Sequence, residues 1–223
     1  GLDVAVAMAT GTYYLQCPSV VKVNLVGKKA KWASAKDVIL YILQQLSVKG
    51  GVNKIIEYTG EGLKELSLTD RATICNMGAE LGATTSVFPT DEITKEYLIQ
   101  QGREEDYVEL KADEDATYDE EITVDLSKLV PLTAKPHSPD AVVPVSELRG
   151  MKINQVVIGS CTNSSLPDML KAAKILKGRR VATHVSLVIA PGSSSILAML
   201  SKCGALADMI ASGARILECG CGP

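Results

Sequence analysis

Residues 156–165 have the sequence VVIGSCTNSS, and this stretch determines how the rest of the chain is interpreted. An apolar run ends at Gly159, and Cys161 follows among small polar residues. Apolar residues then recur at helical spacing over residues 166–176. The pattern predicts a strand, a tight loop with a thiol at its tip, and the start of a helix. Because free N–H groups at a helix N-terminus favour a thiolate or an anion, this loop is the first candidate functional position.

Composition and charge limit the classes of protein to consider. The chain has 223 residues, of which 46% are apolar and 22% charged, and its net charge is −3. These values are typical of a globular protein with one large or two smaller domains, and they argue against a general nucleic-acid binder. No apolar run is long enough to span a membrane, and no basic segment precedes the apolar N-terminus as in a signal peptide. The missing initiator Met indicates processing, a tag or a fragment.

Strands and helices alternate in the second half of the chain, which predicts a parallel α/β sheet. We expect strands at residues 155–158, 185–189 and 214–217, and helices at 166–177, 195–202 and 205–212. The loops after the three strands carry Cys161, the residues 193–195, and Cys219 with Cys221. Parallel strands place these loops at one edge, so the thiols could bind an iron–sulfur cluster, zinc or copper(I). A core of small buried thiols explains the same pattern.

The first half of the chain also alternates between strand and helix patterns. We expect strands at 20–26, 55–58, 84–88 and 122–126, and helices at 34–46, 71–81 and 91–101. Periodicity does not decide between strand and helix for residues 1–10. The acidic residues 103–121 predict a solvated surface, and the prolines of residues 129–145 predict an extended connector at a domain boundary.

The predicted helix 71–81 carries polar residues among small ones. Asn76 and Glu80 are four residues apart, so we expect them on one helix face, and Gly78 and Ala79 permit close approach of a ligand. An exposed polar face without function is the alternative. With no export signal, we expect the six cysteines to be reduced, and Cys17, Cys75 and Cys203 to be buried as small apolar residues.

Two long motifs resemble the aconitase family. They are IGSCTNSS at residues 158–165 and TICNMGAELGATTSVFP at residues 73–89, and shorter matches follow in the family's order over nearly the whole chain. The resemblance implies aconitase-like three-layer α/β/α domains with mainly parallel sheets, within a multidomain enzyme. Residues 1–17 would be the tail of a first domain, 18–128 a second domain carrying Asn76 and Glu80, and 129–223 a third, truncated domain carrying the cluster cysteines.

The resemblance implies a 4Fe-4S iron–sulfur cluster held by three cysteines. Cys161 matches the first ligand and Cys221 the second, while the third would directly follow Pro223. The fourth iron would bind the hydroxyl and carboxylate of a small tricarboxylate or dicarboxylate hydroxy acid as a Lewis acid. Asn76 and Glu80 would bind substrate, with Glu80 also catalytic. The family's other catalytic groups lie outside this chain, so we expect it to be inactive alone and able to self-associate through faces that the missing domains would cover.

The implied activity is that of a hydro-lyase. The motif around Asn76 resembles aconitase itself most, which favours interconversion of citrate and isocitrate through cis-aconitate. Homoaconitase and the large subunit of 3-isopropylmalate dehydratase are the alternatives within the family. An RNA-binding form without the cluster and a thiol or zinc protein are alternatives of other classes. We expect no membrane or nucleic-acid partner, and a location in the cytoplasm or the mitochondrial matrix.

Overall fold

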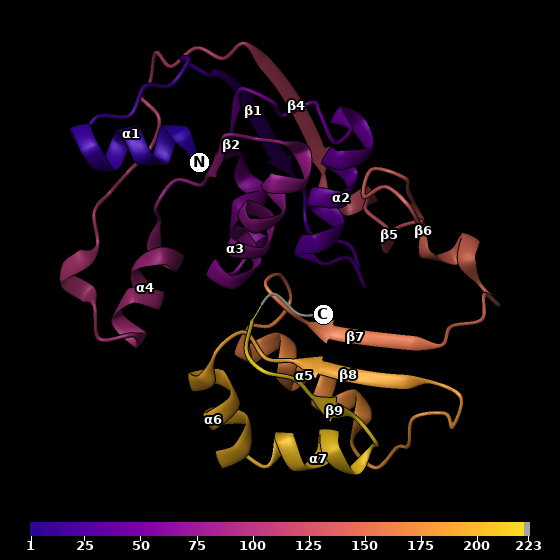
Figure 1. The fold of residues 1–223 in the computed structure, drawn as a ribbon. Helices are drawn as coiled ribbons and strands as arrows, with labels where there is room; N and C mark the ends of the chain where they lie inside the picture. The colour runs from indigo at the N-terminus through magenta and orange to yellow at the C-terminus, as the bar shows by residue number, and fades with distance from the viewer. Residues whose placement is uncertain (221–223) are drawn as a thin grey trace.

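The computed structural model describes residues 1–220 and has two lobes, each built on a parallel β-sheet (Figure 1). The sheet of the first lobe has the order β3-β2-β1-β4, and that of the second lobe has the order β7-β8-β9. All neighbours within both sheets pair in parallel, whereas β5 and β6 form a separate antiparallel pair. The predicted α/β class with mainly parallel sheets is therefore confirmed.

The bounds of the elements follow the predicted alternation. The first lobe contains β1 (Ser19–Val26), α2 (Ala35–Leu46), β2 (Lys54–Thr59), η1 (Glu61–Glu65), α3 (Leu68–Met77), η2 (Gly78–Leu81), β3 (Thr85–Val87), α4 (Glu92–Gln100), η3 (Glu104–Asp106), β4 (Glu120–Asp125), η4 (Leu126–Lys128), β5 (Leu132–Ala134), β6 (Val142–Pro144) and η5 (Val145–Leu148). The second lobe contains β7 (Gln155–Gly159), α5 (Leu166–Leu176), β8 (Ser186–Ala190), α6 (Ser194–Lys202), α7 (Ala205–Ala211) and β9 (Arg215–Ile216).

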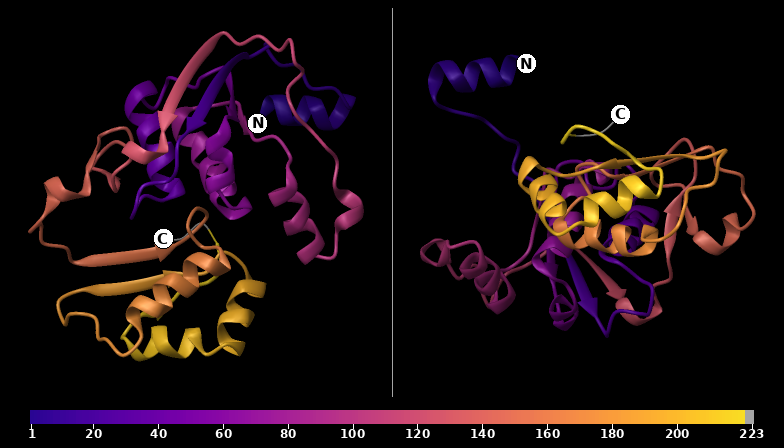
Figure 2. Two further views of the ribbon diagram at one scale, coloured as in Figure 1. Left: turned by 180° about the vertical axis from the view of Figure 1, so that it is seen from behind. Right: turned by 90° about the horizontal axis from the view of Figure 1, so that it is seen from below.

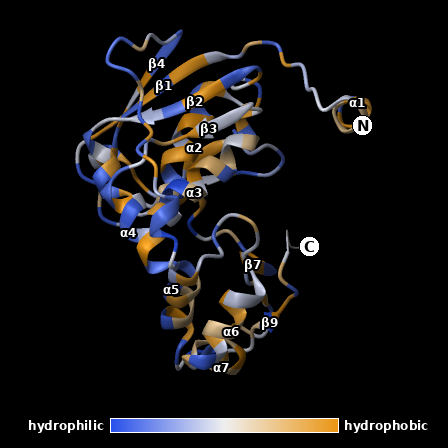
Figure 3. Ribbon diagram, turned by 90° about the vertical axis from the view of Figure 1, so that its left-hand side faces the viewer, coloured by the Kyte–Doolittle hydropathy of each residue, from blue (hydrophilic) through white to orange (hydrophobic). Residues whose placement is uncertain are grey.

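Each lobe has its own hydrophobic core. In β1, Val21, Val23 and Leu25 are fully buried against α2 and α3, as the alternation of the strand predicts. In Figure 3, the orange colour of apolar residues marks α2 and parts of β1 in the first lobe. The opposite face of the sheet carries polar side chains, such as Lys22, which forms an ion pair with Glu121. In the second lobe, α5, α6 and α7 cover β8.

The first residues of the chain form α1 (Leu2–Thr10), which projects away from both lobes (Figure 2). None of its residues is buried, although most of them are apolar. The strand that follows begins at Ser19, after Pro18, which has no N–H group to donate to a sheet. No single helix in residues 1–220 is long and apolar enough to span a membrane; α6 and α7 together pass by length and composition, but they are bent by 87°.

Residues 129–145 differ from the predicted extended connector. They contain the β5–β6 hairpin, which packs on α2. Oδ1 of Asp37 accepts a hydrogen bond of 2.6 Å from the N–H of Leu132, and the amide of Gln44 donates one of 3.1 Å to the carbonyl oxygen of Val142. These two side chains of α2 hold two strands of only three residues each, which explains why the local sequence did not predict them.

Candidate functional site

The loop after β7 places Cys161 at the surface between the two lobes. Gly159 and Ser160 both adopt positive φ, at 114° and 74°, and the N–H of Ser160 bonds the carbonyl oxygen of Ala190 at 2.9 Å. A Cβ at Gly159 would lie 2.0 Å from that oxygen, so only glycine fits. The predicted strand, tight loop and helix are thus confirmed.

The surroundings of Cys161 favour its thiolate form. Hydrogen bonds from Thr162, Asn76 and Ser160 lower the pKa of the exposed thiol. The Sγ atom lies 3.8 Å from Oγ1 of Thr162 and 3.9 Å from Oγ of Ser160. The helix α5 begins only at Leu166, after its cap Ser165. Side-chain hydrogen bonds, rather than the predicted helix N-terminus, therefore account for the shift.

Asn76 joins this loop from the other lobe. Its amide donates a hydrogen bond of 2.9 Å to Oγ1 of Thr162, and Oγ1 of Thr73 donates one of 3.3 Å to the carbonyl oxygen of Thr162. Both donors belong to α3 of the first lobe, whereas Thr162 follows Cys161 in the second. The structure therefore brings Asn76 and Cys161 together, although 84 positions, 77 to 160, separate them in the sequence.

Glu80 lies beyond the end of the α-helix that carries Asn76. The α-helix starts at Leu68, where Ser67 and Asp70 form a capping box, and it ends at Met77. Glu80 lies in the following 3₁₀ turn and lines a cavity of about 430 Å³ together with Thr162. Asn76 lines a separate cavity. The predicted helix 71–81 therefore divides into an α-helix that carries Asn76 and a 3₁₀ turn that carries Glu80. Thr162 accepts a hydrogen bond from Asn76 and lines the same cavity as Glu80.

The other cysteines divide by environment. Cys75 donates a hydrogen bond of 3.5 Å to the carbonyl oxygen of Ser86, and burial raises the pKa of its thiol to about 11. It is half-buried, close to the predicted core position. Cys17 and Cys203 are exposed, so the prediction that they are buried is wrong: Cys17 lies before β1 in an extended segment, and Cys203 lies at the end of α6. Cys219 is also exposed.

The described donors match only part of a cluster site. Cys161 has the exposure and the low thiol pKa that an iron–sulfur ligand needs. Cys221, the predicted second ligand, lies outside the described residues, and the predicted third ligand lies beyond Pro223. Within residues 1–220, no three histidine, cysteine or acidic side chains are grouped as a metal site. The chemistry of Cys161 fits, and the complete ligand set stays a prediction.

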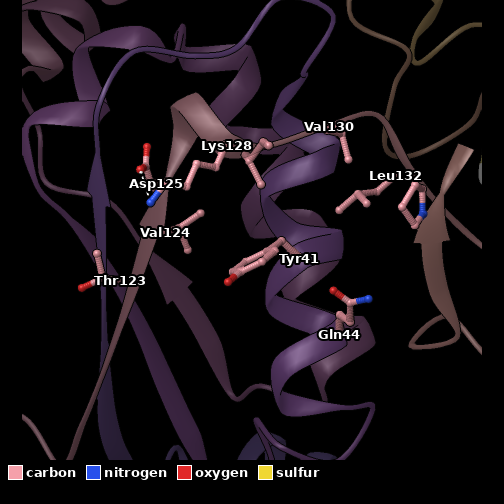
Figure 4. Close-up of a pocket in the computed structure, with 10 residues that line it drawn as sticks. Tyr41, Gln44, Thr123, Val124, Asp125, Lys128, Val130 and Leu132 are labelled. Atoms are coloured by element: carbon pink, nitrogen blue, oxygen red, sulfur yellow. Dashed lines mark ion pairs between the residues drawn. The ribbon is translucent and has the colours of Figure 1, made fainter. Parts of the chain in front are cut away.

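A third cavity lies away from these residues (Figure 4). It has a volume of about 460 Å³ and lies between α2, β4 and the β5–β6 hairpin. Tyr41 and Val124 contribute to its apolar wall, and Lys128 forms an ion pair of 3.2 Å with Asp125 at its edge. None of the predicted site residues lines it. By contrast, the cavity that Glu80 lines is also lined by Thr162 of the loop that carries Cys161 (the cluster loop).

Comparison with known proteins now adds to this geometry. The family model described as "Aconitase family (aconitate hydratase)" matches residues 1–149 and 146–223. This chain belongs to the aconitase family. Its relatives include 3-isopropylmalate dehydratase large subunit 2 of Archaeoglobus fulgidus, 42% identical over 99% of this chain and 53% of the relative. The 3-isopropylmalate dehydratase large subunit of Clostridium kluyveri is 44% identical over 99% of this chain and 52% of the relative.

The chain spans about half the length of the curated relatives that it matches. Among solved structures, the holo-form of Thermococcus kodakaraensis aconitase X is similar, with a TM-score of 0.50 over 92% of this chain and 45% of that one. At 17% sequence identity this similarity shows the fold alone. The predicted family resemblance is thus confirmed over the whole chain.

Proposed function

We propose that this chain is part of an iron–sulfur hydro-lyase that removes water from, and adds it to, a small hydroxy acid. The observation that carries the proposal is the hydrogen-bonded meeting of Asn76 with the Cys161–Thr162 loop across the two lobes. Both partners lie in the two long motifs of the aconitase family, to which the chain belongs. Two motifs remote in sequence are thus hydrogen-bonded to each other, which supports a common reaction centre.

The relatives favour 3-isopropylmalate over citrate as the substrate. The two relatives described above are named 3-isopropylmalate dehydratase large subunits. The sequence alone favours citrate through the motif around Asn76, and the names of full-length relatives outweigh that likeness. We therefore propose a dehydratase acting on 3-isopropylmalate, with citrate as the alternative. This chain would be part of its large subunit and would act together with the rest of that subunit and a partner subunit.

In this proposal the chain contributes ligands, positioning and proton transfer. Cys161 and Cys221, with a cysteine after Pro223, would hold a 4Fe-4S cluster, which supplies a Lewis acid for the substrate hydroxyl when it is bound. The carboxyl group of Glu80 lines the cavity beside Thr162, where it could pass a proton to the leaving hydroxyl and take one back when water is added. Asn76 fixes the loop by donating to Oγ1 of Thr162. Positioning of this kind would hold the substrate and the catalytic groups in the geometry that the reaction needs.

The test uses the complete parent enzyme after anaerobic reconstitution with iron and sulfide. We expect dehydration of 3-isopropylmalate, followed by the ultraviolet absorbance of the unsaturated product, and about four irons and four sulfides per enzyme. Cys161→Ser lowers the iron content and abolishes the activity, whereas Cys203→Ser, at the exposed cysteine that ends α6, leaves both unchanged. A reconstituted enzyme that binds zinc instead of iron, or dehydrates no hydroxy acid, refutes the proposal.

A further inference from the structure

The cavity that contains Glu80 has an uneven chemical lining. It lies between α2, the η2 turn, the β5–β6 hairpin and the cluster loop. Lys36 and Glu80 are the charged residues of its lining, and Thr162 contributes a hydroxyl group. The other lining residues are Leu40, Met77, Leu132, Thr133, Ala134 and Pro139, of which Thr133 alone has a polar side chain. A cation and an apolar wall in one space suit an anion that carries an aliphatic group.

Lys36 brings a positive charge that the described residues do not neutralise. It is the second residue of α2 and is exposed. No carboxylate in residues 1–220 lies within ion-pair distance of its ammonium group. The neighbouring carboxylate of Asp37 is already engaged by the N–H and hydroxyl of Ser34, at 2.6 and 2.7 Å, and by the N–H of Leu132. The ammonium group thus stays available for a ligand.

We propose that Lys36 binds one carboxylate of the substrate and that the facing apolar wall receives the substrate's aliphatic group. This inference rests on the proposed function and adds a substrate-binding residue to it. The lining holds a single cation, which can pair with one carboxylate. A second carboxylate would be desolvated against Leu132 and Ala134 without a partner, whereas an alkyl group is stabilised there. The cavity therefore selects branched aliphatic hydroxydicarboxylates over tricarboxylates.

The experiment compares variants of the complete, reconstituted enzyme. Lys36→Gln keeps the length of the polar side chain but removes its charge, and we expect KM for 3-isopropylmalate to rise about 10- to 100-fold, as for the loss of a hydrogen bond to a charged group. We expect kcat to change less than about threefold, because the bond forms in the ground state as well. Lys36→Arg restores KM to within about fivefold of the wild type. Lys174→Gln, at an exposed lysine on α5, changes neither parameter.

A direct binding measurement accompanies the kinetics. Saturating 3-isopropylmalate slows acetylation of Lys36 by an activated ester, read by mass spectrometry, while acetylation of Lys174 stays constant. Malate, which lacks the alkyl group, protects Lys36 more weakly at equal concentration. Unchanged KM in Lys36→Gln, a loss confined to kcat, or equal acetylation with and without substrate overturns the inference.

These outcomes separate the inference from the proposed function. A wild-type enzyme that dehydrates 3-isopropylmalate while Lys36→Gln matches it refutes the role of Lys36 alone. A wild-type enzyme that dehydrates no hydroxy acid refutes the proposed function, and protection of Lys36 from acetylation still decides whether the anion binds there. Iron content equal to that of the wild type shows that each variant has folded with its site intact.

Discussion

Replacing Asp37 with alanine should destabilise the first lobe more than any ordinary loss of a helix cap. The carboxylate is 5% exposed and makes two kinds of contact. Oδ2 accepts from Ser34 in the capping box of α2, and Oδ1 accepts from the N–H of Leu132 in the hairpin. Losing the cap costs about 1 kcal/mol. Leaving the N–H of Leu132 without a partner costs about 1–3 kcal/mol more.

The expected loss is therefore about 2–4 kcal/mol in the free energy of unfolding. In a chain of this length, that lowers the melting temperature by about 5–15 °C. Urea unfolding followed by circular dichroism measures the free energy, and hydrogen exchange at the N–H of Leu132 reports the local change. Exchange at this amide should accelerate in Asp37→Ala under native conditions, because the hairpin loses its bond to α2.

Asp70→Ala is the matched control for this experiment. Asp70 forms the same capping box with Ser67 at the start of α3, but it accepts no backbone hydrogen bond from another segment of residues 1–220. Its contact with another segment is an ion pair of 3.8 Å with Lys29, which is partly exposed and contributes little. It should cost about 1 kcal/mol, the typical value of a cap. Equal losses in Asp37→Ala and Asp70→Ala, or unchanged exchange at Leu132, would show that the bond to the hairpin contributes nothing.

Three further predictions concern the loops and their charges. Hydrogen bonds from Arg71 and Thr94 outweigh burial and hold the pKa of Asp91 below 3.8. The Asp91 carboxylate therefore stabilises the fold above that pH, and this stabilisation is lost as the pH falls through the folded-state pKa. The difference in the free energy of unfolding between wild type and Asp91→Asn, measured with urea, should shrink at low pH, and a constant difference contradicts the prediction. At pH 8, iodoacetamide should alkylate Cys161 well before Cys75, and a reversed order in peptide mapping refutes the assigned pKa directions. Gly159→Ala should destabilise the chain by at least about 2 kcal/mol, because the new Cβ clashes with the carbonyl of Ala190 and the backbone is strained. The control Gly178→Ala should cost about half as much, because φ is +69° there but the space is open. Equal shifts of the melting temperature in the two variants would contradict this.

The elements with strong local signals were predictable from the sequence. The alternation of β1 fixes which of its residues face the core, and Ser34 begins α2 as expected. Asp91 and Ser193 likewise cap α4 and α6 through hydrogen bonds to Thr94 and Ile196. In these cases the signal and the structure that it specifies lie within a few residues of each other. The proximity of Asn76 and Cys161 followed only from the family resemblance.

What the sequence missed depends on contacts between distant segments. The close approach of β3 shapes the end of α3, since a Cβ at Gly78 would lie 2.4 Å from Oγ of Ser86. The α-helix gives way to a 3₁₀ turn at this point, and Glu80 lies in that turn. Lys36 carries no local mark of function, because its cavity is formed by four segments that meet only in the folded chain.

The hydrogen bonds that meet at Thr162 have a consequence for how the protein would lose metal. They join α3 of the first lobe to the loop that carries Cys161 in the second. Coupling between two binding events is reciprocal. If Cys161 holds the proposed cluster, an arrangement of the lobes that fixes the loop would raise the affinity for metal, and bound metal would strengthen the contact between the lobes by the same free energy. Under the proposed function, we therefore expect the two lobes to separate more readily once oxidation has removed the iron, and limited proteolysis with and without the cluster would detect this.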